Sequence, residues 1–142
     1  MSRRKPLDAV ATVRRQHENA AARDLAAAQA RHAAEQQRLT ELQGYLREYE
    51  SAPAKASVHW LANRARFLAR LQEAVQAQRQ RLQEAEAALE AGRTRHLLAR
   101  RDRKVQQRLQ AAYARADARD AERRAQSTLD DWSAARHGDA VA

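Results

Sequence analysis

Residues 25–49 read LAAAQARHAAEQQRLTELQGYLREY, and their inward-facing positions recur in alternating three- and four-residue steps. This spacing is a seven-residue repeat, typical of a helix whose narrow apolar seam faces another helix. It therefore predicts an all-α fold, a long antiparallel two-helix coiled coil (a helical hairpin) with an overhanging C-terminal helix. The predicted seam residues are Leu25, Ala28, His32, Glu35, Leu39, Leu42, Leu46 and Tyr49, and then Leu61, Leu68, Leu71, Val75, Gln78, Leu82, Ala85 and Leu89.

Proline, serine and glycine positions divide the chain into two predicted helices and a hinge within one coiled-coil domain, 1–142. Pro6 suits a first helical turn. Pro53 biases the residue before it away from helical geometry, and Ser57 is a suitable N-cap for the helix that follows. Gly138 marks the expected stop. The predicted boundaries are helix 1 at about 7–50, the hinge at 51–57, helix 2 at about 58–136 and a frayed tail at 137–142.

The register of the hairpin can also be predicted. If the chain folds back near residue 54, residue i lies opposite roughly residue 108 − i, and helix 1 ends opposite residues near 100. The repeat places seam positions at 99 and 106, but the apolar residues are Leu98 and Val105. We therefore expect a slip near Gly92. In helix 1, three residues also leave the register of the later seam: Leu7, Val10 and Val13.

Composition indicates a protein that works by contact. Aromatic residues are 4% of the chain, and it has three glycines, two prolines and no cysteine. A two-helix hairpin of this composition has no deep pocket, so we expect neither an enzyme nor a cofactor or small-molecule substrate. The five histidines are too scattered to form a metal site. No secretory signal or bilayer-spanning stretch is apparent, so we expect a cytoplasmic protein.

The net charge of +9 points to a partner with negative potential. Basic residues of both predicted helices gather at the end of the hairpin away from the hinge, which we name the basic tip. Docking to acidic groups and a solvated helix face are both open interpretations. No aromatic residue interleaves the arginines to stack on bases, so the signal for nucleic acid is weak. The basic tip comprises Arg14, Arg15, Arg93, Arg95, Arg100, Arg101, Arg103, Lys104 and Arg108.

A second group of residues lies near the hinge, along one stripe on each helix. An apolar flank on a charged helix suggests docking. From spacing alone, shielding of the seam edge is the favoured interpretation. This hinge stripe comprises Arg38, Leu42, Tyr45 and Tyr49 on helix 1, and Phe67, Leu71, Ala74 and Gln78 on helix 2.

Several segments of the chain are distinctive: PLDAV at 6–10, YLREY at 45–49, NRARFLARLQEAV at 63–75 and the downstream arginines. Together they resemble the flagellar type III export protein family FliJ. The resemblance implies a coiled coil similar to the central stalk of rotary ATPases. It also implies that such a protein inserts into the ring of the export ATPase FliI, promotes its assembly, contacts the export gate protein FlhA and escorts export chaperones.

The resemblance also implies roles and a location. The hinge stripe corresponds to the gate-binding positions of the family, which favours docking over shielding. Arg38 and Gln78 stand where the family has glutamine and histidine. The implied location is peripheral, at the cytoplasmic face of the inner membrane. The alternatives are the equivalent stalk of a virulence-type injectisome, a basic coiled coil that binds nucleic acid and, least favoured, an amphipathic helix on a membrane surface.

Overall fold

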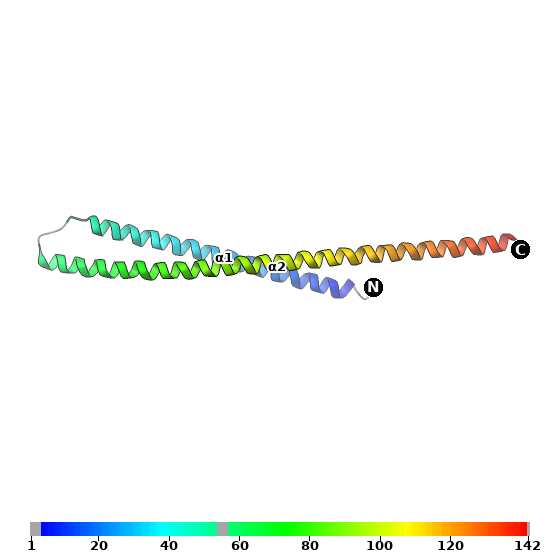
Figure 1. Ribbon diagram of the computed structural model, residues 1–142, viewed down its shortest axis with the longest axis horizontal. Coiled ribbons are helices and arrows are strands. Elements are labelled where there is room, and N and C mark those ends of the chain that lie inside the picture. The colour runs from blue at the N-terminus through cyan, green and yellow to red at the C-terminus, as the bar shows by residue number, and fades with distance from the viewer. Residues whose placement is uncertain (1–3, 54–56, 142) are drawn as a thin grey trace. The chain divides into compact units, whose positions relative to one another are not determined.

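The computed structural model describes residues 4–53 and 57–141, which form two helices, α1 (Arg4–Ser51) and α2 (Val58–Val141) (Figure 1). The part of the chain that is described contains no strand, and segments of α1 pack antiparallel against segments of α2. The predicted all-α helical hairpin is confirmed. Of the predicted hinge, residues 54–56 lie outside the described ranges.

The helix ends follow from local chemistry. Pro6 occupies the first turn of α1, where its missing N–H removes no helical hydrogen bond. Ser57 caps α2, because its Oγ accepts a hydrogen bond from the Trp60 N–H at 3.4 Å and its carbonyl accepts one from the Leu61 N–H at 3.0 Å. The predicted N-cap is therefore confirmed.

α2 continues to Val141, so the structure has helix over 137–141, where the sequence predicts a frayed tail; residue 142 lies outside the described residues. The prediction relied on Gly138 as a helix stop. Glycine ends a helix by adopting positive φ, and Gly138 does not adopt it. Inside a helix, glycine costs only about 1 kcal/mol relative to alanine, which a long helix tolerates.

The chain divides into two compact units, and α1 and α2 contribute to both. One consists of residues 17–99 and contains the hinge; we name it the hinge unit. The other consists of residues 1–16 together with 100–142; we name it the terminal unit.

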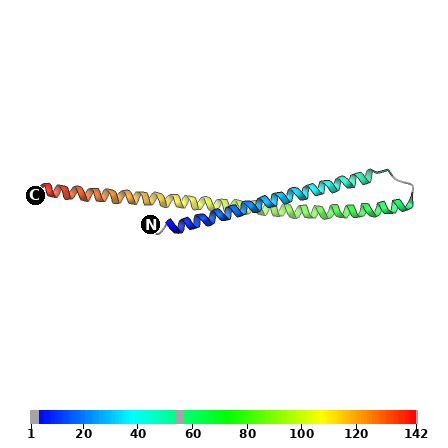
Figure 2. The same cartoon turned by 180° about the vertical axis from the view of Figure 1, so that it is seen from behind.

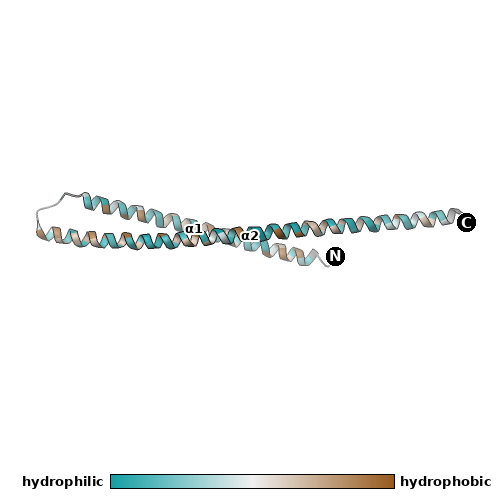
Figure 3. Ribbon diagram, viewed as in Figure 1, coloured by the Kyte–Doolittle hydropathy of each residue, from teal (hydrophilic) through white to brown (hydrophobic). Residues whose placement is uncertain are grey.

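The hinge unit has the predicted apolar seam. Leu39, Val75, Ala85 and Leu89 are its buried hydrophobic residues, with at most 8% of their surface exposed. Each occupies a predicted seam position. Hydrophobic positions recur at intervals along the helices and do not form one block (Figure 3). This is expected for a narrow seam that uses two positions in every seven.

A polar layer interrupts this apolar seam. Gln78 is 3% exposed, and its Nε2 donates hydrogen bonds to the Glu35 carbonyl at 3.1 Å and to Glu35 Oε2. Further along, His32 Nε2 lies 3.6 Å from Glu86 Oε1. Polar seam residues such as these fix the register between two helices at some cost in stability.

Removing one partner of the polar layer should destabilise the protein more than removing both. Gln78→Leu leaves the Glu35 carboxylate without its donor, and we expect the free energy of unfolding to fall by about 1–3 kcal/mol. The double variant Glu35→Leu with Gln78→Leu restores an apolar layer and should match or exceed the wild type. Urea unfolding followed by circular dichroism measures both, and a double variant as unstable as the single one would contradict this account.

The predicted register is wrong by several residues. Tyr49 stacks on Phe67, whereas the prediction places residue 59 opposite it. Glu35 binds Gln78 instead of lying opposite residue 73. The prediction assumed that the two helices end level at the hinge. Two opposite views show the first turns of α2 extending past the last turn of α1 (Figures 1 and 2), so every α1 residue of the hinge unit faces a later α2 residue.

The expected slip near Gly92 does not occur. Gly92 is buried on the seam, and a Cβ on it would lie 3.7 Å from Leu25. The repeat continues in step along α2, since Ala99 is half-buried and Gln106 is 6% exposed. The seam keeps its register and becomes polar, so the apolar residues Leu98 and Val105, which are exposed, do not mark a slip.

In the terminal unit, the seam is held by polar contacts. Gln106 Nε2 donates a hydrogen bond to the Leu7 carbonyl at 3.3 Å, and Arg14 Nη1 lies 3.6 Å from Asp102 Oδ2. Leu7 is half-buried here, so its predicted displacement from the seam is wrong. Beyond these contacts, α2 runs past the first turn of α1 within this unit, and residues 118–138 are exposed throughout. The overhanging C-terminal helix is thus present.

Candidate protein-docking surfaces

All eight residues of the hinge stripe lie in the hinge unit, but they are not equally accessible. Tyr45 is 53% exposed, and Tyr49 and Phe67 are each 44% exposed. Arg38 is exposed too, whereas Leu42, Leu71 and Ala74 are half-buried along the seam edge. Gln78 is buried in the polar layer, so it supports the stripe from beneath and offers little surface to a partner.

The aromatic residues of the stripe connect the two helices. The ring centroids of Tyr49 on α1 and Phe67 on α2 lie 4.4 Å apart, with a tilt of 42° between the ring planes. This is a favourable geometry for an aromatic pair. Since nearly half of each residue remains exposed, the pair shields the seam edge and also presents an apolar surface to solvent.

Sequence reasoning missed Arg64, which fixes this aromatic pair in place. Its Nη2 donates hydrogen bonds to the carbonyls of Tyr49 and Glu50, both at 2.9 Å. These carbonyls belong to the last turn of α1, where helical partners are lacking. The guanidinium also lies 5.6 Å from the centroid of the Trp60 ring. The available signal was its place in the seam repeat, seven residues before Leu71, where a bulky apolar residue is usual.

Arg64→Leu should weaken any partner that binds the hinge stripe without unfolding the helices. The change frees the end of α1, so Tyr49 loses its fixed position against Phe67. We expect a fall in affinity of about five- to tenfold, equivalent to roughly 1–1.4 kcal/mol. Arg66→Leu is the matched control, since Arg66 lies two residues further along α2 and its side chain is exposed. Equal affinities for the two variants would show that Arg64 positions nothing that the partner recognises.

The structure brings most, but not all, of the basic tip into one unit. Arg93 and Arg95 belong to the hinge unit, where Arg93 Nη1 lies 2.6 Å from Glu90 Oε1. The remaining seven residues belong to the terminal unit, in which the N-terminal segment packs against α2 as predicted. The exposed members are Arg15, Arg100, Arg101, Lys104 and Arg108, while Arg14 and Arg103 are half-buried at the seam.

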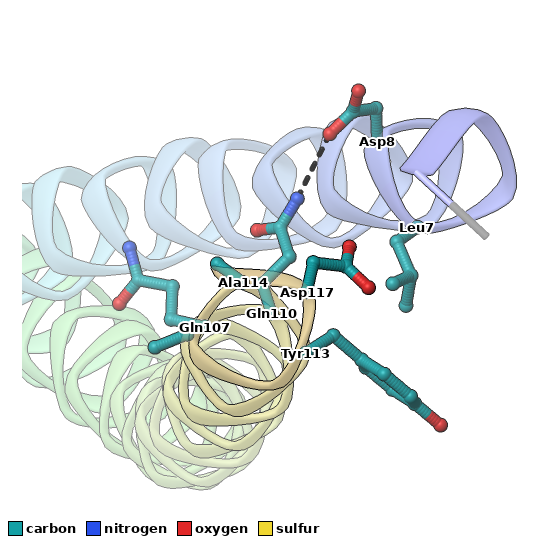
Figure 4. Close-up of a pocket in the computed structure, with 8 residues that line it drawn as sticks. Leu7, Asp8, Gln107, Gln110, Tyr113, Ala114 and Asp117 are labelled. Carbon is teal, nitrogen blue, oxygen red and sulfur yellow. Dashed lines mark hydrogen bonds between the residues drawn. The ribbon is translucent and has the colours of Figure 1, made fainter. Parts of the chain in front are cut away.

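Open grooves lie along one side of the terminal unit. The larger, of about 480 Å³, contains the contact in which the Gln110 amide donates to Asp8 Oδ1 at 3.0 Å (Figure 4). A smaller one, of about 290 Å³, includes Arg15 and Arg103. Their mixed amide, carboxylate and guanidinium lining suits contact with another chain. The larger groove is lined by Leu7, Asp8, Gln107, Gln110, Ala111, Tyr113, Ala114 and Asp117.

The described residues offer neither a metal-binding cluster nor a bilayer-spanning stretch. Within 4–53 and 57–141, no group of three or more histidine, aspartate or glutamate side chains is arranged to hold a metal ion. Over the same residues, neither helix has a stretch that is apolar enough to cross a bilayer.

Comparison with known protein families gives a match that covers nearly all of the chain. The family described as flagellar FliJ protein matches residues 3–141. No curated protein and no solved structure matches the chain. The match covers nearly the whole sequence, including both helices, the hinge stripe and the basic tip, so the chain belongs to the FliJ family of flagellar export proteins.

Proposed function

We propose that this protein is a non-enzymatic stalk and adaptor of the flagellar type III export apparatus. The terminal unit would insert into the ring of the export ATPase FliI and promote its assembly and activity. The hinge unit would bind the export gate protein FlhA, and the protein would also escort export chaperones. It would act at the cytoplasmic face of the inner membrane, held there through these partners.

The observation that carries the proposal is the different chemistry of the two units. The hinge unit offers an exposed aromatic pair braced by Arg64, a surface suited to an apolar contact. The terminal unit offers five exposed arginine and lysine side chains of the predicted basic tip, a surface suited to acidic groups. Two chemically distinct surfaces on one chain suit a protein that links two partners.

Such a protein would act on the ATPase without doing chemistry itself. A ring of subunits passes through several conformations and assembly states, and a ligand shifts their populations only as far as its affinities for them differ. Basic side chains that meet acidic groups in one arrangement of the ring, and miss them in another, would supply that difference. ATP hydrolysis itself would remain with the residues of the ATPase.

Sedimentation of the purified chain with FliI and with the cytoplasmic part of FlhA tests the adaptor role. We expect FliI and FlhA to sediment together only when this chain is present. The absence of any complex with either protein, at both low and moderate salt, would contradict the proposal. Steeply salt-dependent binding to a DNA duplex instead would favour the nucleic-acid alternative.

A further inference from the structure

The terminal unit carries polar side chains at its seam and leaves several hydrophobic side chains exposed to solvent. Its seam carries Gln106, which is 6% exposed, together with Arg14 and Gln110. Hydrophobic side chains of the same segments are left in solvent. They are Val10 (43% exposed), Val13 (46%), Val105 (57%) and Leu109 (47%).

These four residues share one side of the helix pair, which we name the outer apolar face. Each directly precedes a seam position: Val10 precedes Ala11, and Leu109 precedes Gln110. In an antiparallel pair, residues offset in this sense from the seam lie on the same side on both helices. The Arg14–Asp102 ion pair crosses the seam on this side, because Asp102 stands one heptad before Leu109. Asp8 and Gln107, which line the grooves, follow seam positions and lie on the other side.

The border of the outer apolar face is positively charged. Arg101 and Arg108 stand one residue before Asp102 and Leu109 on α2 and are exposed. The carboxylate of Asp102 is already engaged by Arg14 at 3.6 Å. A complementary surface would therefore combine an apolar stripe with carboxylates along its edge.

We propose that the outer apolar face binds an amphipathic helix of a partner protein, with an apolar stripe bordered by aspartate or glutamate. A third helix would lie against α1 and α2 on this side and cover the two valines of α1 together with Val105 and Leu109. The result is a three-helix bundle whose apolar core replaces the polar seam as the main source of stability in the terminal unit. The inference depends on these exposures and charges, and not on which export protein supplies the helix.

Two other occupants fit less well. A second copy of this chain, seated on the same face, would bring Arg101 and Arg108 close to their own counterparts and create repulsion. A nucleic acid backbone would use the arginines but would leave the apolar side chains uncovered. The acidic helix satisfies both features at once.

A labelled synthetic peptide tests the proposal with the full chain. The probe carries leucine at the two seam positions of each heptad and glutamate beside them, and its binding is followed by fluorescence anisotropy. One comparison peptide has lysine in place of glutamate, and another has serine in place of leucine. We expect the leucine–glutamate peptide to bind, and both comparison peptides to bind at least about tenfold more weakly.

Two double variants of the chain test whether the peptide binds at the outer apolar face. Val105→Ser with Leu109→Ser should reduce the affinity for the leucine–glutamate peptide by about tenfold or more, with helicity unchanged because both residues are exposed. The control is Val58→Ser with Leu97→Ser, which are 83% and 67% exposed in the hinge unit and should have no effect. Equal binding by both double variants would overturn the proposal. So would equal binding of the serine peptide, or a wild-type dimer in sedimentation that Val105→Ser with Leu109→Ser abolishes.

Discussion

Replacing Tyr45 and Phe67 together with alanine should weaken binding to FlhA by about thirtyfold or more, equivalent to roughly 2 kcal/mol or more. Exposed aromatic residues that are held rigidly are the side chains on which interface energy concentrates. Tyr45 is 53% exposed, and Phe67 is 44% exposed and fixed against Tyr49 at 4.4 Å. Isothermal titration of the FlhA cytoplasmic part with each variant measures the change.

A matched control separates docking from general loss of apolar surface. Leu129→Ala with Trp132→Ala removes a similar area from residues that are each 58% exposed on the overhanging part of α2. Helicity should be retained in both double variants, and only the hinge variant should lose affinity for FlhA. If the two variants bind FlhA equally, Tyr45 and Phe67 merely shield the seam edge.

Reversing the charge of Arg100, Arg101 and Arg108 to glutamate should abolish most of the stimulation of FliI. These three side chains are exposed, so the substitutions leave the seam intact. Arg103 is left unchanged because it is half-buried at the seam, where a glutamate would also disturb packing. The variant changes the local charge by six units, and like charges facing an acidic ring surface cost several kcal/mol in total. At least about a tenfold rise in the concentration needed for half-maximal stimulation is expected.

The matched charge control lies in the hinge unit. Arg66, Arg70 and Arg79 are also exposed, and their reversal to glutamate changes the net charge of the protein by the same amount. Stimulation of FliI should survive this change. Equal loss with both triple variants would assign the effect to net charge, and unchanged stimulation with both would make the basic tip a solvated helix face.

The heptad spacing was enough to predict the two helices and the interior of the hinge unit. Leu39, Val75, Ala85 and Leu89 are buried where the repeat places them. The reason is that residues three and four positions apart lie on the same face of a helix, so apolar residues at these spacings pack against the same neighbour. The Ser57 cap was equally predictable, since capping depends on the residue and its immediate neighbours.

The errors arose where the pattern of apolar residues and the packing of the backbone diverge. Near Gly92 the apolar residues shift by one position, but Gln106 keeps the seam in step by bonding to the Leu7 carbonyl. A glutamine side chain is long enough to reach a backbone carbonyl across the seam. A pattern based on hydropathy does not predict such a contact, because glutamine is polar. The pairing of Tyr49 with Phe67 was missed because a hinge specifies how the chain turns but not how far one helix runs past the other.

The candidate docking surfaces were predictable as sets of residues and not as geometry. The hinge stripe lies together in one unit, but the burial of Gln78 and the clamp by Arg64 depend on partners distant in sequence, Glu35 and Tyr49. The basic tip was predicted as one cluster. The structure assigns Arg93 and Arg95 to the hinge unit, because the two helices pair several residues further along α2 than the hinge suggested.

The rate of ATP hydrolysis by FliI, measured over a range of added chain, tests the stalk and adaptor role most directly. The account predicts stimulation that saturates at about one chain per six ATPase subunits, as expected for a single stalk in a closed ring. Absence of stimulation at every ratio, with the helicity of the chain retained, would contradict it.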